Sequence, residues 1–157
     1  MTTPLGATLE REHRTIDDAI LRFVDAGPSA ATREQHIALL DAVAVLRRHI
    51  YLEEQYLFPP LRAAGLVGPV MVMVHEHALM WPLLDQIERL VADRDFDNAA
   101  QQCRNLLEML NSHNMKEERI LYPQADTLPQ GDLDELAELL STAELPAGWV
   151  CGGVTIT

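Results

Sequence analysis

The sequence has little cysteine and little positive charge. Its two cysteines, Cys103 and Cys151, do not form a C-x-x-C pair, which excludes a disulfide framework and a cysteine-based zinc or redox site. Lys+Arg number 12 against 24 Asp+Glu, so the net charge is −12, and no basic cluster occurs. Because nucleic acids and anionic membrane surfaces bind through basic patches, we expect neither as a partner.

The sequence also lacks a long hydrophobic run. The segment MTTPLGATLEREHRTIDD at the start carries charge where a secretory signal needs an apolar stretch. The most apolar short run, residues 67–74, contains Gly68 and Pro69 and is much shorter than the roughly 20 residues of a membrane span. We therefore expect a soluble, cytoplasmic protein with no membrane partner.

Hydrophobic residues make up 48% of the chain, which is enough for the core of one globular domain. They recur at helical spacing in four long segments, and no period-2 alternation typical of a strand persists. The sequence therefore predicts an all-α protein. The expected helices cover residues 4–26, 32–58, 70–93 and 96–122, and a shorter amphipathic helix covers residues 132–140.

Prolines and short connections define how these helices are arranged. Pro59 and Pro123 are expected to end the second and fourth helices, and Pro82 to kink the third. Short connections favour antiparallel neighbours, which predicts an up-down-up-down four-helix bundle with a short fifth helix. We expect a bundle domain over residues 1–145, followed by an apolar, glycine-rich tail, 146–157, that packs on the bundle or on a neighbouring chain.

Each of the four long helices interrupts its apolar stripe with a histidine. In the second and fourth helices a glutamate follows at i+4, a spacing that puts both side chains on the same helix face. The residues of this pattern are His13, His49, Glu53, His77, His113 and Glu117.

The pattern is a repeat with an offset of 64 residues. HIYLEEQYLFP from residue 49 returns as HNMKEERILYP from residue 113, and the first-helix histidine returns in the third helix. Two helix hairpins related in this way are expected to pack with pseudo-twofold symmetry. They would direct four imidazoles and two carboxylates at one point in the core, which predicts a dinuclear metal site.

A core without metal is the alternative to this prediction. A single histidine on an apolar face is usually a hydrogen-bonded core residue, but two carboxylates buried without cations cost several kcal/mol each. Imidazole and carboxylate ligands without thiolate suit iron, manganese or zinc. Two metals that share two carboxylates favour a diiron or dimanganese centre. The His-x-x-x-Glu spacing differs from the Glu-x-x-His of ferritin-like bundles.

At these residues the chain resembles the hemerythrin-like (HHE cation-binding) family. The likeness covers about Leu9 to Gln124, with E-H in the first and third helices and H-x-x-x-E in the second and fourth. It implies that the six residues are ligands of two irons, bridged by the two glutamates and by an oxo or hydroxo group. Oxygen-carrying members have a fifth histidine one turn after the third-helix ligand, and here that position is Trp81.

Two further residues are candidate ligands. Tyr56 continues the helix face of His49 and Glu53, and a phenolate suits ferric iron; the alternative is an ordinary core tyrosine. Asp17 lies one turn after His13, and its alternative is a solvated helix face. Four glutamates flank the ligands, either as acceptors for imidazole N–H groups or as solvated side chains: Glu12, Glu54, Glu76 and Glu118.

Without the fifth histidine, each metal could retain an open position. We therefore expect a reaction with a small oxidant, H2O2 in a catalase-like reaction or NO, with Tyr56 as the candidate for proton transfer. The alternative is non-enzymatic, reversible binding of O2, NO or iron for carriage, storage or sensing. A purely structural role for the metals is weakest, because a bundle of this size has enough core without them. We expect a monomer or a weak homodimer.

Overall fold

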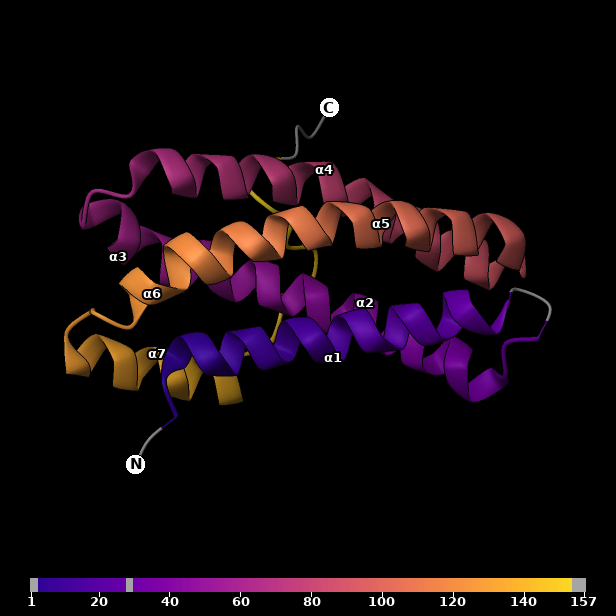
Figure 1. Cartoon of the computed structure of the whole chain (residues 1–157), viewed down its shortest axis with the longest axis horizontal. Helices are drawn as coiled ribbons and strands as arrows, with labels where there is room; N and C mark the ends of the chain where they lie inside the picture. The colour runs from indigo at the N-terminus through magenta and orange to yellow at the C-terminus, as the bar shows by residue number, and fades with distance from the viewer. Residues whose placement is uncertain (1–2, 28–29, 154–157) are drawn as a thin grey trace.

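The computed structural model describes residues 3–27 and 30–153, and over these residues the chain is helical with no strand. Four long helical segments run up, down, up and down, and a shorter helix follows them (Figure 1), as the sequence predicts. The elements are α1 (Leu5–Ala26), α2 (Arg33–Leu52), η1 (Glu53–Leu57), α3 (Phe58–Ala63), α4 (Val67–Ala92), α5 (Phe96–Lys116), η2 (Glu117–Leu121), α6 (Tyr122–Ala125) and α7 (Gln130–Thr142).

Local sequence signals account for several helix ends. Gly27 ends α1 with φ of 82°, a left-handed conformation that costs glycine little. Thr32 begins α2 with a capping box, in which its hydroxyl accepts from the Gln35 N–H at 3.2 Å and its own N–H donates to the Gln35 side chain at 2.9 Å. Asp95 caps α5 by accepting from the Asn98 N–H.

The prediction that Pro59 and Pro123 end their helices is wrong. The second segment continues through α3 to Ala63, and the fourth continues through α6 to Ala125. A π-helical turn, η1 or η2, precedes each proline and brings it to the first turn of a new α-helical stretch, where a backbone N–H is not needed. The third segment, α4, also runs through Pro82 and begins at Val67, three residues earlier than expected.

The core consists of two apolar clusters with a polar layer between them. Each long segment contributes to both clusters: in α4, for example, Met73 belongs to one and Met80 to the other, and His77 lies between them. The polar layer contains six buried residues that are at most 3% exposed, namely His13, His49, Glu53, His77, His113 and Glu117. These six polar residues therefore lie inside the bundle, between the two apolar clusters.

The last part of the chain packs on the bundle. Arg48 of α2 supplies hydrogen bonds to carbonyl groups at the C-terminal end of α7, which have no partner within that helix. The acceptors are the carbonyls of Leu139, Leu140 and Ala143. From there the chain passes α2 and reaches α4 (Figure 1). Trp149, Val150 and Cys151 of the expected tail thus pack on the bundle, while 154–157 lie outside the described residues. None of the described helices is long and apolar enough to cross a membrane.

Candidate metal centre

The structure brings all six residues of the His/Glu pattern together. They form two overlapping groups of possible metal ligands, and within each group the ligand atoms all lie within 4.8 Å of one another. Site A consists of His13, His49, Glu53 and Glu117, and site B consists of Glu53, His77, His113 and Glu117. Both glutamates belong to both sites, as two metals sharing two carboxylates require.

Within one helical segment, each glutamate lies next to the histidine that precedes it by four residues. The His49 Nε2 atom is 3.3 Å from Glu53 Oε2, and the His113 Nε2 atom is 3.2 Å from Glu117 Oε1. Glu53 and Glu117 are also the first residues of η1 and η2. The ligands therefore sit where the α-helix changes to a π turn, a feature frequent at functional sites.

Each glutamate also reaches a histidine of the other half. Glu53 Oε1 lies 3.3 Å from His77 Nε2 on α4, and Glu117 Oε1 lies 3.3 Å from His13 Nε2 on α1. The carboxylates thus lie between the two histidine pairs. This geometry suits bridging glutamates better than glutamates that each serve one metal.

The flanking glutamates hold the outer nitrogens of the histidines. Every Nδ1 atom faces a carboxylate, while every Nε2 atom faces the centre of the cluster. The pairs are His13 with Glu118 (3.2 Å), His49 with Glu12 (2.9 Å), His77 with Glu54 (2.7 Å) and His113 with Glu76 (2.9 Å). The offset of 64 residues maps the Glu12–His49 pair onto the Glu76–His113 pair. It also maps Glu54 onto Glu118 and His13 onto His77, so the other two pairs correspond as well. The repeat therefore includes these outer carboxylates.

These contacts favour the acceptor interpretation of the four glutamates over a solvated helix face. A carboxylate at Nδ1 accepts the ring N–H and leaves the Nε2 lone pair available to a metal. The Glu76 carboxylate also accepts from the Lys116 ammonium group. The hydrogen bond from His113, together with Lys116, lowers the pKa of Glu76 to about 2 and keeps it a carboxylate.

The two buried carboxylates, Glu53 and Glu117, need positive charge close by, because burial without it is unfavourable. Burial opposes protonation of His113, but the Glu117 carboxylate, with Glu76, outweighs it and raises the pKa of His113 to about 10. Burial would likewise raise the pKa of Glu53, yet His49 and its other partners hold that pKa well below its ordinary value. The pKa values of His49 and His77 are raised as well, so protons on these three histidines balance the carboxylates in the metal-free chain, and metals would replace these protons.

Buried atoms without hydrogen bonds indicate that the residues fit metal ions. Of the five buried side-chain atoms without a hydrogen-bond partner in the described residues, three belong to the cluster: Glu53 Oε1, His77 Nε2 and Glu117 Oε2; the other two are Asp17 Oδ1 and His36 Nε2. Such atoms cost free energy unless something else binds them. Two cations, each held by two imidazoles and the shared carboxylates, would satisfy all three.

Tyr122 is a site residue that the sequence interpretation missed. Its hydroxyl donates to Glu53 Oε2 at 2.8 Å and lies 3.0 Å from His13 Nε2 and 3.2 Å from His49 Nε2. Burial, with Glu117 and Glu53 nearby, raises the pKa of this phenol well above its ordinary value. The repeat contained a signal, since the offset of 64 pairs Tyr122 with Phe58, so that only one of the two halves has a phenol at this position.

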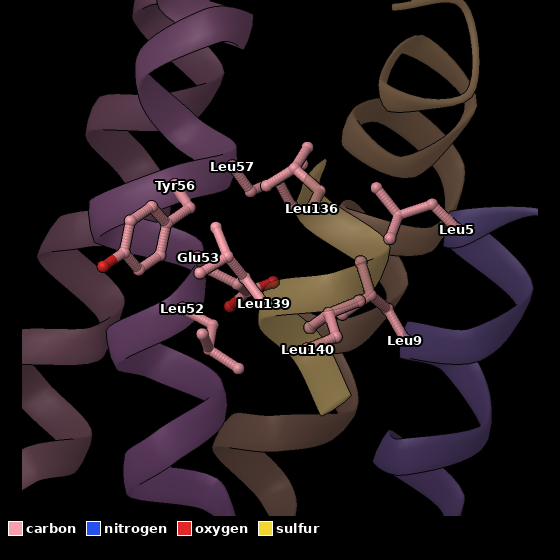
Figure 2. A pocket seen from close by; sticks show the side chains of 9 residues that line it. All are labelled: Leu5, Leu9, Leu52, Glu53, Tyr56, Leu57, Leu136, Leu139 and Leu140. Atoms are coloured by element: carbon pink, nitrogen blue, oxygen red, sulfur yellow. The ribbon is translucent and has the colours of Figure 1, made fainter. Parts of the chain in front are cut away.

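Tyr56 and Asp17 do not join the cluster. The Tyr56 hydroxyl lies 3.3 Å from the Tyr51 hydroxyl and points away from the Glu53 carboxylate (Figure 2). Asp17 is partly buried and belongs to neither group of possible ligands. The structure therefore moves the phenol candidate from Tyr56 to Tyr122 and gives Asp17 no ligand contact. Trp81, at the position of the fifth histidine, packs under the Arg47 guanidinium, 4.6 Å from its carbon to the ring centre.

Comparison with known proteins agrees with this geometry. The family model for the hemerythrin HHE cation binding domain matches residues 5–125, which span all four long segments. The chain belongs to this family. No curated protein and no solved structure matches the chain. As an HHE domain, it combines the family assignment with two overlapping His/Glu groups that fit a dimetal site.

Proposed function

We propose that this HHE domain holds two irons and reacts with a small oxidant, H2O2 in a catalase-like reaction. Four imidazoles and two shared carboxylates, with no thiolate, form a donor set that suits iron. Manganese and zinc accept the same donors, so iron is part of the proposal. An oxo or hydroxo group as a third bridge between the irons is the corresponding expectation from the family.

The proposal rests on a difference between the two sites in the aromatic residue beside the histidines. Site A has the Tyr122 hydroxyl beside its histidines, whereas in site B the equivalent residue is Phe58, whose ring stacks on His77 with centroids 5.7 Å apart. Trp81 supplies no ligand atom to site B. A metal at site B would thus keep a position for an exogenous molecule, as a reaction with peroxide requires.

The reaction disproportionates two H2O2 molecules into two waters and O2. When bound, the two irons supply two electrons to one H2O2 molecule and take two from the next. The first molecule needs two protons to become two waters, and the second releases two protons as it becomes O2. The chain must therefore store and return protons close to the metals.

Tyr122 is placed to hold such a proton at its hydroxyl oxygen. The hydroxyl contacts Glu53 and lies 3.3 Å from Glu117, so it reaches both shared carboxylates. A proton at this oxygen can pass to either carboxylate along these contacts, and positioned proton donors contribute on the order of 100-fold or more to a rate. The buried surroundings also limit loss of protons to solvent.

Reversible binding of O2 or NO, or reaction with NO, is the second candidate. A small cavity of about 10 Å³ lies beside Glu53 and Tyr56 and is otherwise lined by leucines (Figure 2). A volume of this size suits a molecule as small as water or a diatomic gas. The leucines favour an apolar diatomic over H2O2. They are Leu5, Leu9, Leu52, Leu57, Leu136, Leu139 and Leu140.

An oxygen-electrode trace after adding H2O2 to the iron-loaded protein tests the proposal. We expect rapid O2 evolution from a chain shown to contain two irons, and its loss in Glu117→Ala, which controls for free iron. Tyr122→Phe should retain iron and evolve O2 at least tenfold more slowly. No O2 from the two-iron protein would contradict the catalase-like reaction and favour reversible binding.

A further inference from the structure

The C-terminal part of the chain passes directly beside site B. Residues 149–153, here called the strap, run from α2 to α4. At one end, the Trp149 ring packs edge-on against Tyr51 and Trp81, with centroids 5.1 Å and 5.5 Å away. Cys151, in the middle, is only 2% exposed. The strap therefore packs against the bundle core through Trp149, Val150 and Cys151, while Gly152 and Gly153 lie at the surface.

The strap makes a main-chain hydrogen bond to the outer shell of site B. The Gly152 N–H donates to Glu54 Oε1 at 2.8 Å, and the other oxygen of Glu54 faces His77 Nδ1 at 2.7 Å. A continuous chain of contacts thus links the strap to His77, one of the two histidines of site B. With both oxygens engaged, the Glu54 carboxylate has one orientation, and so has the imidazole it holds.

Site A has no equivalent of the strap among the residues that the structure describes. Glu118, the counterpart of Glu54, lies 3.2 Å from His13 Nδ1, and within the described residues no main-chain N–H is hydrogen-bonded to it. Its side chain is 27% exposed, against 6% for Glu54. Water can therefore compete for Glu118, while the strap shields Glu54.

We propose that the strap positions His77 through Glu54, so that the metal in site B is released more slowly than the metal in site A. Gly152 and Glu54 are positioning residues in this account, since they do not contact the metal themselves. The proposal rests on the dimetal site of the proposed function, but not on its reaction with peroxide.

Gly153 shows how closely the strap fits. A Cβ atom at this position would lie 2.7 Å from the Ala78 Cβ and 3.2 Å from the Val74 carbonyl oxygen, both on α4. The first distance is too short for two carbon atoms, so Gly153→Ala must displace the strap. Gly131 offers a matched control, because a Cβ there meets nothing within 4 Å.

The test is the rate of iron release from the full chain to an excess of chelator, after the iron content has been counted. We expect two kinetic phases in the original protein. Glu54→Gln identifies the phase of site B and Glu118→Gln that of site A. Gly153→Ala should accelerate the site B phase about tenfold and leave the other unchanged. Gly131→Ala should change neither phase.

Two further variants keep the test decisive. Trp149→Ala frees the other end of the strap and should accelerate the same phase as Gly153→Ala. Adding Ala78→Gly to Gly153→Ala removes the closest clash and should return the rate toward the original. A chain that binds two irons but releases them in one phase, or unchanged phases in Gly153→Ala, would overturn the role of the strap. A chain that binds fewer than two metals would instead contradict the proposed dimetal function.

Discussion

Sites A and B have the same inner geometry and different surroundings. The rings of His13 and His49 lie 4.8 Å apart at 53°, and those of His77 and His113 lie 4.8 Å apart at 52°. Around this common frame, Tyr122 adds a hydroxyl at site A, and Gly152 of the strap adds a hydrogen bond at site B.

This comparison separates what the repeat provides from what single residues add. The repeat supplies both sites with the same ligands because each hairpin contributes the same residue types at the same spacing. The structural differences between the sites come from features present on one side only. A symmetric frame thus offers two similar groups of possible ligands, while a few residues without a counterpart in the repeat make their surroundings unequal.

Removal of a shared glutamate should have the largest effect, because it damages both sites. We expect Glu53→Ala and Glu117→Ala to lose both metals, and His77→Ala to lose mainly the metal of site B. The glutamate variants also leave buried histidines without their partner, at a cost of about 3 to 5 kcal/mol in the metal-free chain. Metal analysis after desalting, together with urea unfolding, measures both effects. Two irons per chain in either glutamate variant would contradict the shared assignment.

A rise in pH should lower the free energy of unfolding of the metal-free chain. The pKa of His113 is about 10 in the folded chain, above the ordinary value of 6.5. Its protonation therefore stabilises the fold fully below pH 6.5, and this contribution is lost as the pH rises toward 10. We expect a decline on the order of a few kcal/mol in urea unfolding with chelator present.

The metal-loaded chain provides the control for this pH dependence. Bound metals replace the protons, so the decline between pH 6.5 and 10 should disappear when both sites are filled. The same decline with and without metal would show that the histidines do not exchange protons for metal.

Moving the phenol hydroxyl from site A to site B should have an intermediate effect on stability and on O2 evolution. Tyr122→Phe removes the donor to Glu53 and should cost about 1 to 3 kcal/mol in unfolding free energy, with the metal content unchanged. Adding Phe58→Tyr places a hydroxyl at site B, where we expect part of the lost O2 evolution to return. Recovery measured with the oxygen electrode would show that a phenol at either site suffices. Undiminished O2 evolution in Tyr122→Phe alone would remove the phenol from the reaction.

Tyr56→Phe should have the smallest effect. The change deletes the contact with the Tyr51 hydroxyl but no contact with sites A or B. We expect less than about 1 kcal/mol loss of stability and an unchanged visible spectrum of the iron-loaded protein. Loss of a charge-transfer band in this variant, and not in Tyr122→Phe, would reverse the assignment of the two tyrosines.

The helices and the six clustered residues could be predicted because their signals are local. An apolar stripe with period 3.6 determines which face is buried, and a histidine or glutamate in that stripe must enter the core. The 64-residue repeat then indicates that the interruptions of both hairpins meet. The ends at Pro59 and Pro123 could not be placed in this way, because a proline both ends helices and begins them.

The π turns explain why the sequence pointed to Tyr56, whereas the structure places the Tyr122 hydroxyl beside the clustered residues. With period 3.6, position 56 continues the face of His49 and Glu53, which made Tyr56 the candidate. A π turn bonds residue i to i+5, and the N–H groups of Phe58 and Tyr122 bond to the carbonyls of Glu53 and Glu117. The side chain five residues after each glutamate is therefore brought to the site.

The sequence by itself thus determined the helical bundle, the repeat and the set of six possible ligands, because each follows from spacing along one helix. Only the tertiary structure decided which phenol enters the site, which glutamate holds which histidine and where the strap lies. The physical reason is that these contacts join segments far apart in the chain: Tyr122 with His13, Glu12 with His49, and Gly152 with Glu54. Their geometry depends on how the packed helices and their π turns rotate each side chain.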